Sequence, residues 1–111
     1  MAYVGLAQTA EQRGKAEPKS GANASVTIAM DPTGGVTVQL DSTPNGQGHQ
    51  TVAAQIAAEA LGLTPDDIDV VTEADTRTIA WSIASGNYSN RFAASVSGAV
   101  LLCARRVAGK L

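Results

Sequence analysis

The chain has 111 residues, and its eight basic and ten acidic side chains give a formal net charge of −2, which offers no basic face of the kind that nucleic-acid binding requires. Its single cysteine, Cys103, excludes an internal disulfide framework, and without a second cysteine or a nearby histidine it excludes a zinc site. The length predicts one domain, residues 1–111, and because no apolar run reaches the ~18 residues of a membrane span and no signal peptide begins the chain, we expect a soluble, cytoplasmic protein without a membrane partner.

The first part of the chain has the pattern of β-strands. Residues 3–9 mix β-branched, aromatic and small side chains, and after a charged, aperiodic loop residues 25–30 alternate between apolar and polar. Residues 36–41 alternate in the same way, and Asp31–Gly35 between the two runs has the aspartate, proline and glycines of a tight turn. These segments predict three strands, of which the last two pair as an antiparallel hairpin.

A glycine-punctuated turn, Pro44–Thr51, follows the hairpin and precedes an alanine-rich helix. Gly46 and Gly48 allow the backbone to adopt positive φ and to approach a ligand closely, while the first turn of a helix leaves its N–H groups unpaired. A phosphate, pyrophosphate or carboxylate placed there would gain several backbone donors and the positive end of the helix dipole. A glycine before a helix is more often a plain turn, so these residues alone leave both interpretations open.

Helical periodicity occurs twice in the rest of the chain. Apolar residues at helical spacing predict a helix over 49–61, which Gly62 ends as a left-handed cap, and a long C-terminal helix over 90–109. The β-branched run 68–72 predicts another strand, which completes a strand–helix–strand unit. The predicted fold class is α+β: an antiparallel β-hairpin, then the strand–helix–strand unit, then the C-terminal helix, with the helices packed on one face of the sheet.

No catalytic constellation accompanies these elements. His49 is the only histidine, so a serine–histidine–aspartate arrangement could exist only around it, and no nucleophile elbow is present. A P-loop would need a lysine after the glycines, where Gln50 stands, and a dinucleotide-binding fingerprint would need a third glycine, where Thr51 stands. We therefore assign no catalytic residue and no metal ligand.

Four motifs stand in order along the chain: Gly-Gln-Gly-His-Gln-Thr at 46–51, the helix at 55–62, Asp-Thr-Arg-Thr at 75–78, and the loop at 87–91 that opens the last helix. Together they resemble the molybdopterin-binding domain of molybdenum hydroxylases. That family includes xanthine dehydrogenase, aldehyde oxidase and the large subunit of aerobic carbon monoxide dehydrogenase. The resemblance extends from about Ala2 to the end of the chain, and the glycine motif is most similar to the carbon monoxide dehydrogenase branch.

The resemblance implies a ligand, the pyrophosphate and pyranopterin of molybdopterin, often as the cytosine dinucleotide in bacterial members. In the family, residues that match the glycine motif bind this cofactor through a side-chain amide, backbone N–H groups and a hydroxyl, and the loop before the last helix supplies a second wall. The implied cofactor-binding residues are Gly46, Gln47, Gly48, His49, Thr51, Ser89, Asn90 and Arg91. For the arginine, an ion pair with Glu73 or Asp75 is an open alternative.

The resemblance also implies that the chain is incomplete as an enzyme. A molybdenum subunit of the family is several-fold longer and uses a glutamate general base on a glycine-rich loop, and no glutamate here lies in such a setting. We therefore expect one subdomain of an oxidoreductase that binds its cofactor only in the complete protein. Its partners would be the remaining domains of the molybdenum subunit and iron–sulfur and flavin subunits, and apolar surface meant for them would favour self-association. Two alternatives are a stand-alone module for another phosphorylated ligand and an interaction domain with a vestigial site.

Overall fold

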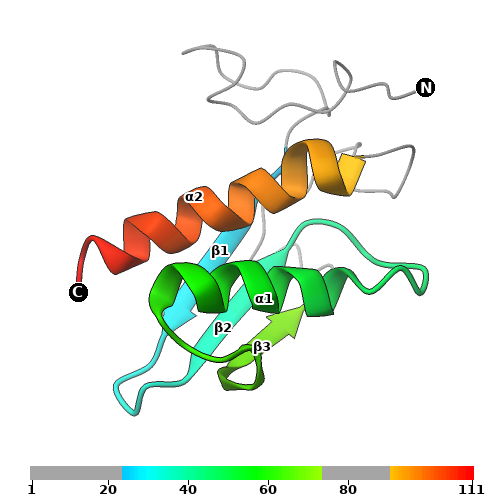
Figure 1. Ribbon diagram of the computed structural model, residues 1–111. Coiled ribbons are helices and arrows are strands. Elements are labelled where there is room, and N and C mark those ends of the chain that lie inside the picture. The colour runs from blue at the N-terminus through cyan, green and yellow to red at the C-terminus, as the bar shows by residue number, and fades with distance from the viewer. Residues whose placement is uncertain (1–23, 74–90) are drawn as a thin grey trace.

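The structure, a computed structural model, describes residues 24–73 and 91–111 (Figure 1). The strand expected over 3–9 and the loop expected over 75–90 lie outside the described residues. Within the described part, three strands form a sheet in the order β1 (Val26–Met30), β2 (Val36–Leu40) and β3 (Ile68–Val71).

The antiparallel hairpin is confirmed, because β1 pairs with β2 in antiparallel register. The turn between them is fixed by Asp31, whose Oδ1 accepts hydrogen bonds from the N–H of Thr33 (2.8 Å) and the N–H of Gly35 (2.9 Å). Gly34 adopts a φ of 94°, at which any residue with a Cβ would be strained. The turn residues therefore determine which residues of the two strands face each other.

The strand–helix–strand unit is also confirmed. The helix α1 (His49–Leu61) connects β2 to β3, and these two strands are parallel. Gly62 ends α1 with a φ of 72°, as a left-handed cap. The chain then makes one 3-10 turn, η2 (Pro65–Asp67), in which the carboxylate of Asp67 accepts hydrogen bonds from the N–H and hydroxyl of Thr64 at 3.1 and 2.8 Å.

The two long helices, α1 and α2 (Ser97–Ala108), lie side by side on one face of the sheet (Figure 1). The register places Ile28 opposite Val38, so the apolar residues of β1 and β2 point to this same face. Alanines such as Ala53 and Ala57 are fully buried and allow α1 to approach the strands closely. The α+β fold with helices on one face is thus confirmed.

The start of the C-terminal helix differs from the regular α-helix that the sequence predicts over 90–109. Residues Phe92–Val96 form a π-helical segment, η3, in which the N–H of Ser97 bonds to the carbonyl of Phe92. The wider turn buries both Ser95 and Val96, and the hydroxyl of Ser97 donates to the carbonyl of Ala93 at 2.9 Å. π-helical turns are rare overall, and those that occur often lie at functional sites.

No helix in the described ranges is long and apolar enough to cross a membrane.

Candidate functional site

The candidate site lies where β2 and β3 end and where α1 and α2 begin. Because β2 and β3 are parallel, their carboxyl ends meet at one edge of the sheet, and α1 starts at that edge. Figure 1 shows that α2 begins at the same end of the molecule as α1. Ligands of open sheets with parallel strands usually bind at this edge, beside the helix N-termini.

The glycine loop, Gly46–Gly48, forms the approach to α1 from this edge. Gly46 has a φ of 94° and Gly48 a φ of 79°, and a Cβ built on either would meet no atom of the described residues within 4 Å. Gly48 is the N-cap residue, and no side chain caps the helix. The first turn of α1 therefore offers backbone N–H groups that no side chain caps, and an anion can accept hydrogen bonds from such groups.

Two polar side chains stand at this helix start. Gln47 is exposed, and its Oε1 accepts a hydrogen bond from the N–H of Asn45, which leaves the amide hydrogens on Nε2 as donors for a ligand. Thr51 is exposed in the first turn of α1. Between them in sequence, Gln50 donates from Nε2 to the hydroxyl of Thr72 at 3.4 Å, so the helix start is linked to the end of β3.

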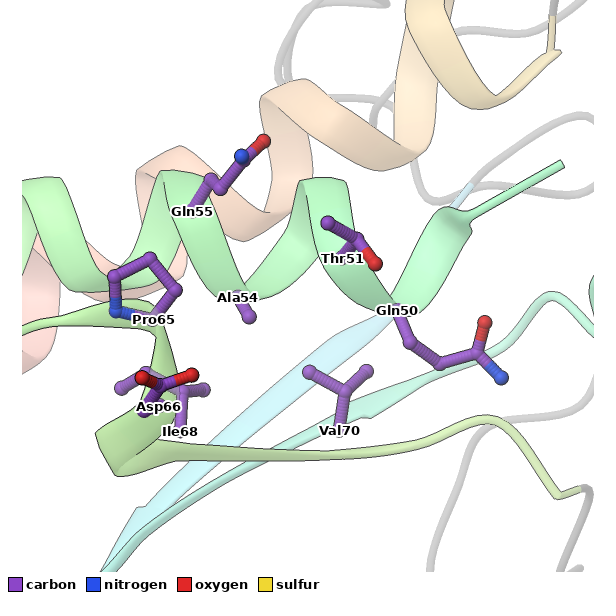
Figure 2. A pocket seen from close by; sticks show the side chains of 8 residues that line it. All are labelled: Gln50, Thr51, Ala54, Gln55, Pro65, Asp66, Ile68 and Val70. Atoms are coloured by element: carbon purple, nitrogen blue, oxygen red, sulfur yellow. The ribbon is translucent and has the colours of Figure 1, made fainter.

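A groove of 260 Å³ runs from this helix start along β3 (Figure 2). Its lining combines apolar and polar side chains: Gln50, Thr51, Ala54, Gln55, Pro65, Asp66, Ile68 and Val70. The hydroxyl of Thr51 thus belongs both to the first turn of α1 and to the mouth of the groove.

The side chain of His49 turns into the protein. It is only 7% exposed, and its ring stacks on Phe92 with 3.9 Å between ring centroids and 12° between planes. Burial lowers the pKa of His49, and the nearby charge of Arg91 lowers it further. The ring is therefore neutral near pH 7, its Nδ1 is buried without a hydrogen-bond partner, and its backbone N–H is the group that faces the helix start.

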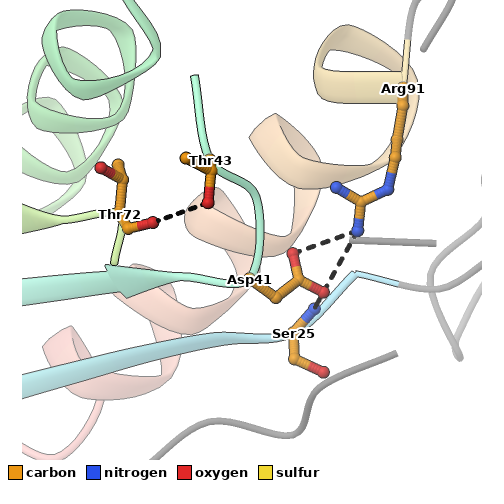
Figure 3. A network of polar contacts seen from close by, with 5 residues as sticks. All are labelled: Ser25, Asp41, Thr43, Thr72 and Arg91. Atoms are coloured by element: carbon orange, nitrogen blue, oxygen red, sulfur yellow. Dashed lines mark hydrogen bonds and ion pairs between the residues drawn. The ribbon is translucent and has the colours of Figure 1, made fainter. Parts of the chain in front are cut away.

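Arg91 is also buried and is paired inside the protein. Its Nη2 nitrogen lies 3.1 and 3.2 Å from the two carboxylate oxygens of Asp41, a partner that the sequence did not single out (Figure 3). Of the two partners that the sequence left open, Asp75 lies outside the described residues. The same carboxylate accepts the N–H of Ser25 at 2.8 Å. Burial raises the pKa of Asp41, while the charge of Arg91 and the Ser25 hydrogen bond oppose that rise.

The structure thus gathers most of the residues that the sequence indicated. Gly46, Gln47, Gly48, His49 and Thr51 lie together at one edge, and the His49–Phe92 stack brings η3 beside them. Ser89 and Asn90 lie outside the described residues.

The sequence did not indicate three buried polar residues near this edge: Asp41, Ser42 and Ser95. The signal for the first two is a run of polar residues directly after a buried strand. For Ser95 it is a polar residue beside Val96 on an otherwise apolar helix start. In residues 24–73 and 91–111, no three histidine, cysteine, aspartate or glutamate residues are grouped as a metal site.

Comparison with known proteins shows which family this chain is similar to. The family model described as molybdopterin cofactor-binding domain matches residues 3–111. The carbon monoxide dehydrogenase large chain of Afipia carboxidovorans is 35% identical over 86 residues, which cover 78% of this chain and 10% of that one. The nicotine 6-hydroxylase large subunit of Paenarthrobacter nicotinovorans is 38% identical over 85 residues, which cover 77% of this chain and 10% of that one. This chain spans about a tenth of the length of the curated relatives it matches.

Solved structures agree with this comparison. The crystal structure of Cu,Mo-CO dehydrogenase in its carbon monoxide reduced state superposes with a TM-score of 0.70 at 34% identity, over 79% of this chain and 11% of that one. Quinoline 2-oxidoreductase from Pseudomonas putida 86 superposes with a TM-score of 0.63 at 35% identity, over 77% of this chain and 10% of that one.

Proposed function

Because this chain belongs to the molybdopterin cofactor-binding domain family, we propose that its glycine loop and the first turn of α1 hold the pyrophosphate and part of the pterin of molybdopterin. The observation that carries the proposal is the uncapped start of α1 beside two glycines of positive φ with open space around them. A pyrophosphate there is held by backbone donors and the helix dipole, so neither a lysine nor a protein-bound metal ion is needed.

Each residue of the loop has a distinct role in this proposal. Gly46 and Gly48 let the backbone approach the phosphates, because a Cβ at either position would occupy the space of the ligand. The amide of Gln47 donates a hydrogen bond while staying neutral, and Thr51 donates from its hydroxyl. His49 contributes its backbone N–H, while its neutral ring supports the loop from inside.

The start of the C-terminal helix forms the opposite wall of the proposed site. Ser89 and Asn90 would contact the cofactor from the loop that precedes this helix. Arg91 is held by Asp41, so its contribution is to the shape of the wall.

We propose that the parent protein is an oxidoreductase of the molybdenum hydroxylase class, located in the cytoplasm. The relatives include a carbon monoxide dehydrogenase large chain and a nicotine 6-hydroxylase large subunit, and this chain corresponds to about a tenth of each. The bound cofactor supplies the redox chemistry, and the nucleotide form we propose is the cytosine dinucleotide. The chain binds it together with the remaining domains of the subunit, beside iron–sulfur and flavin subunits, and is inactive alone.

The proposal is tested by adding inorganic pyrophosphate to the ¹⁵N-labelled chain and following backbone amide resonances by NMR. We expect saturable shifts at Gly46, Gly48, Gln50 and Thr51. Gly48→Val should abolish these shifts, because it places a side chain in the ligand space and strains a φ of 79°.

Gly34→Val is the matched control. It strains a positive φ of the same kind, also beside open space, but in the hairpin turn at the opposite end of β2. This variant should bind pyrophosphate like the unaltered chain. Two outcomes would contradict the proposal: shifts confined to the basic residues near the C-terminus (Arg105, Arg106 and Lys110), or no shifts at millimolar pyrophosphate. Tighter binding of one free mononucleotide than of pyrophosphate would favour a stand-alone module.

A further inference from the structure

We propose that Asp41 and Arg91 are a positioning pair that holds the start of the C-terminal helix against the end of β2 and the first turn of α1. The inference rests on the proposed function, since the first turn of α1 is the place given to the cofactor. Neither residue needs to touch the ligand, because both side chains lie inside the protein: Asp41 is 3% exposed and Arg91 is 2% exposed.

The pair connects segments that are far apart in sequence. Fifty residues separate Asp41 from Arg91, and the contact runs from the end of β2 to the residue before η3 (Figure 3). Asp41 also accepts the N–H of Ser25 at 2.8 Å, just before β1 begins. The carboxylate of Asp41 therefore connects the segment that precedes the glycine loop to the start of β1 and to the start of the C-terminal helix.

A second contact joins the same two segments. The residue after Arg91 is Phe92, and its ring stacks on His49 in the first turn of α1. The ion pair and the ring stack are thus two attachment points between the start of the C-terminal helix and the segment that runs from the end of β2 to the first turn of α1. Two attachment points restrict the relative orientation of two segments more than one does.

Stability alone is a weak reason for this ion pair. Removing two charges from water is costly, and apolar residues of similar volume often stabilise a fold equally well or better. What a buried ion pair adds is a defined geometry, because few other arrangements satisfy both charges. Beside the proposed cofactor site, that geometry sets how the start of the C-terminal helix lies relative to the first turn of α1.

The test separates position from stability. In Asp41→Asn, far-UV circular dichroism and the nuclear Overhauser contacts between Val38 and Ala57 should persist, whereas contacts between the His49 and Phe92 rings should be lost. Pyrophosphate should bind at least ten-fold more weakly. Arg91→Lys, made alone in the chain that keeps Asp41, should retain the ring contacts and most of the affinity, because a single nitrogen of Arg91 makes both contacts with the carboxylate.

Asp31→Asn is the matched control, with the same charge change in a carboxylate that accepts hydrogen bonds in the hairpin turn. It should leave ring contacts and affinity unchanged. If Asp41→Asn does not fold, the double variant Asp41→Leu/Arg91→Met removes both charges at similar volume, and we expect it to fold but to lose the ring contacts.

Ring contacts that persist in the folded Asp41 variants would overturn the positioning role, whatever the ligand does. Failure of the unaltered chain to bind pyrophosphate would overturn the proposed function alone, because the ring contacts report on position without any ligand.

Discussion

Three buried polar side chains near the candidate site have atoms without a hydrogen-bond partner: Ser42, His49 and Ser95. Such a group typically lowers the free energy of unfolding by about 1–3 kcal/mol, because it loses its hydrogen bonds to water and forms none within the protein. Ser42 follows β2, His49 begins α1 and Ser95 lies in η3, so all three flank one edge of the sheet. Unsatisfied buried groups in native proteins need an explanation, and a functional edge is one.

The buried ring of His49 makes the stability of the chain depend on pH. Its folded pKa is lowered from 6.5 by burial and by Arg91, so below pH 6.5 the unfolded chain binds more protons than the folded chain. The free energy of unfolding is therefore fully maintained above pH 6.5 and decreases as the pH falls below it. Urea unfolding at pH 7.5 and at 5.5 should give the lower midpoint at 5.5.

His49→Phe provides the control for this pH effect, since it keeps a ring against Phe92 but cannot titrate. Because His49 is the only histidine in the chain, the variant should show a smaller difference between the two pH values. An equal drop in both proteins would assign the pH dependence to carboxylates instead.

At the residue scale, what the sequence could predict was local. The glycines at 46 and 48 and the cap at Gly62 have conformations that neighbouring residues determine, so the sequence indicated them. The Asp41–Arg91 pair could not be found in the same way, because any of several carboxylates could reach an arginine and only the fold selects one. Burial of His49 likewise depends on Phe92, which is distant in sequence.

At the element scale, β2 is the central strand of the sheet and contributes a large part of the core. Val36, Val38 and Leu40 are buried and alternate with half-buried polar residues, and β2 pairs with both other strands. The alternation predicted this strand because a period of two follows directly from strand geometry. The π-helical start of the last helix was not predictable from the period, since one extra residue in one turn barely alters an apolar spacing.

Leu40→Ala should be the more damaging of two leucine truncations. Leu40 is fully buried under the helices, so its truncation should cost about 2–5 kcal/mol of unfolding free energy through lost burial and a cavity. Leu63, which is 37% exposed after α1, should cost about 1 kcal/mol or less when truncated. Urea unfolding measures both, and comparable losses would contradict the central role of β2.

At the scale of the whole molecule, the described sheet ends at β3. No other described strand pairs with its outer side, and the groove along α1 runs beside it. A strand at the end of a sheet presents N–H and C=O groups that can pair with another chain. The strand that pairs with an edge strand cannot be predicted from one short sequence, because that strand can belong to another chain.

We therefore expect the isolated chain to self-associate. Static light scattering should show a weight-average mass that rises with concentration. Val70→Lys, which places a charge in the groove beside β3, should keep the mass closer to that of one chain, because inward charges block edge pairing. Circular dichroism should verify that the variant folds. A constant monomer mass for the unaltered chain up to about 100 μM would contradict this expectation.

The uncapped start of α1 has one more consequence, for how freely this loop can change over evolution. Recognition that relies on peptide N–H groups survives almost any exchange of side chains, because every residue except proline brings the same donor. For these backbone contacts, only the two positions with positive φ are restricted in residue type, whereas the proposed side-chain donors Gln47 and Thr51 are restricted by their own chemistry. Apart from those donors, homologous loops can therefore change most residues and still offer an anion the same main-chain N–H groups.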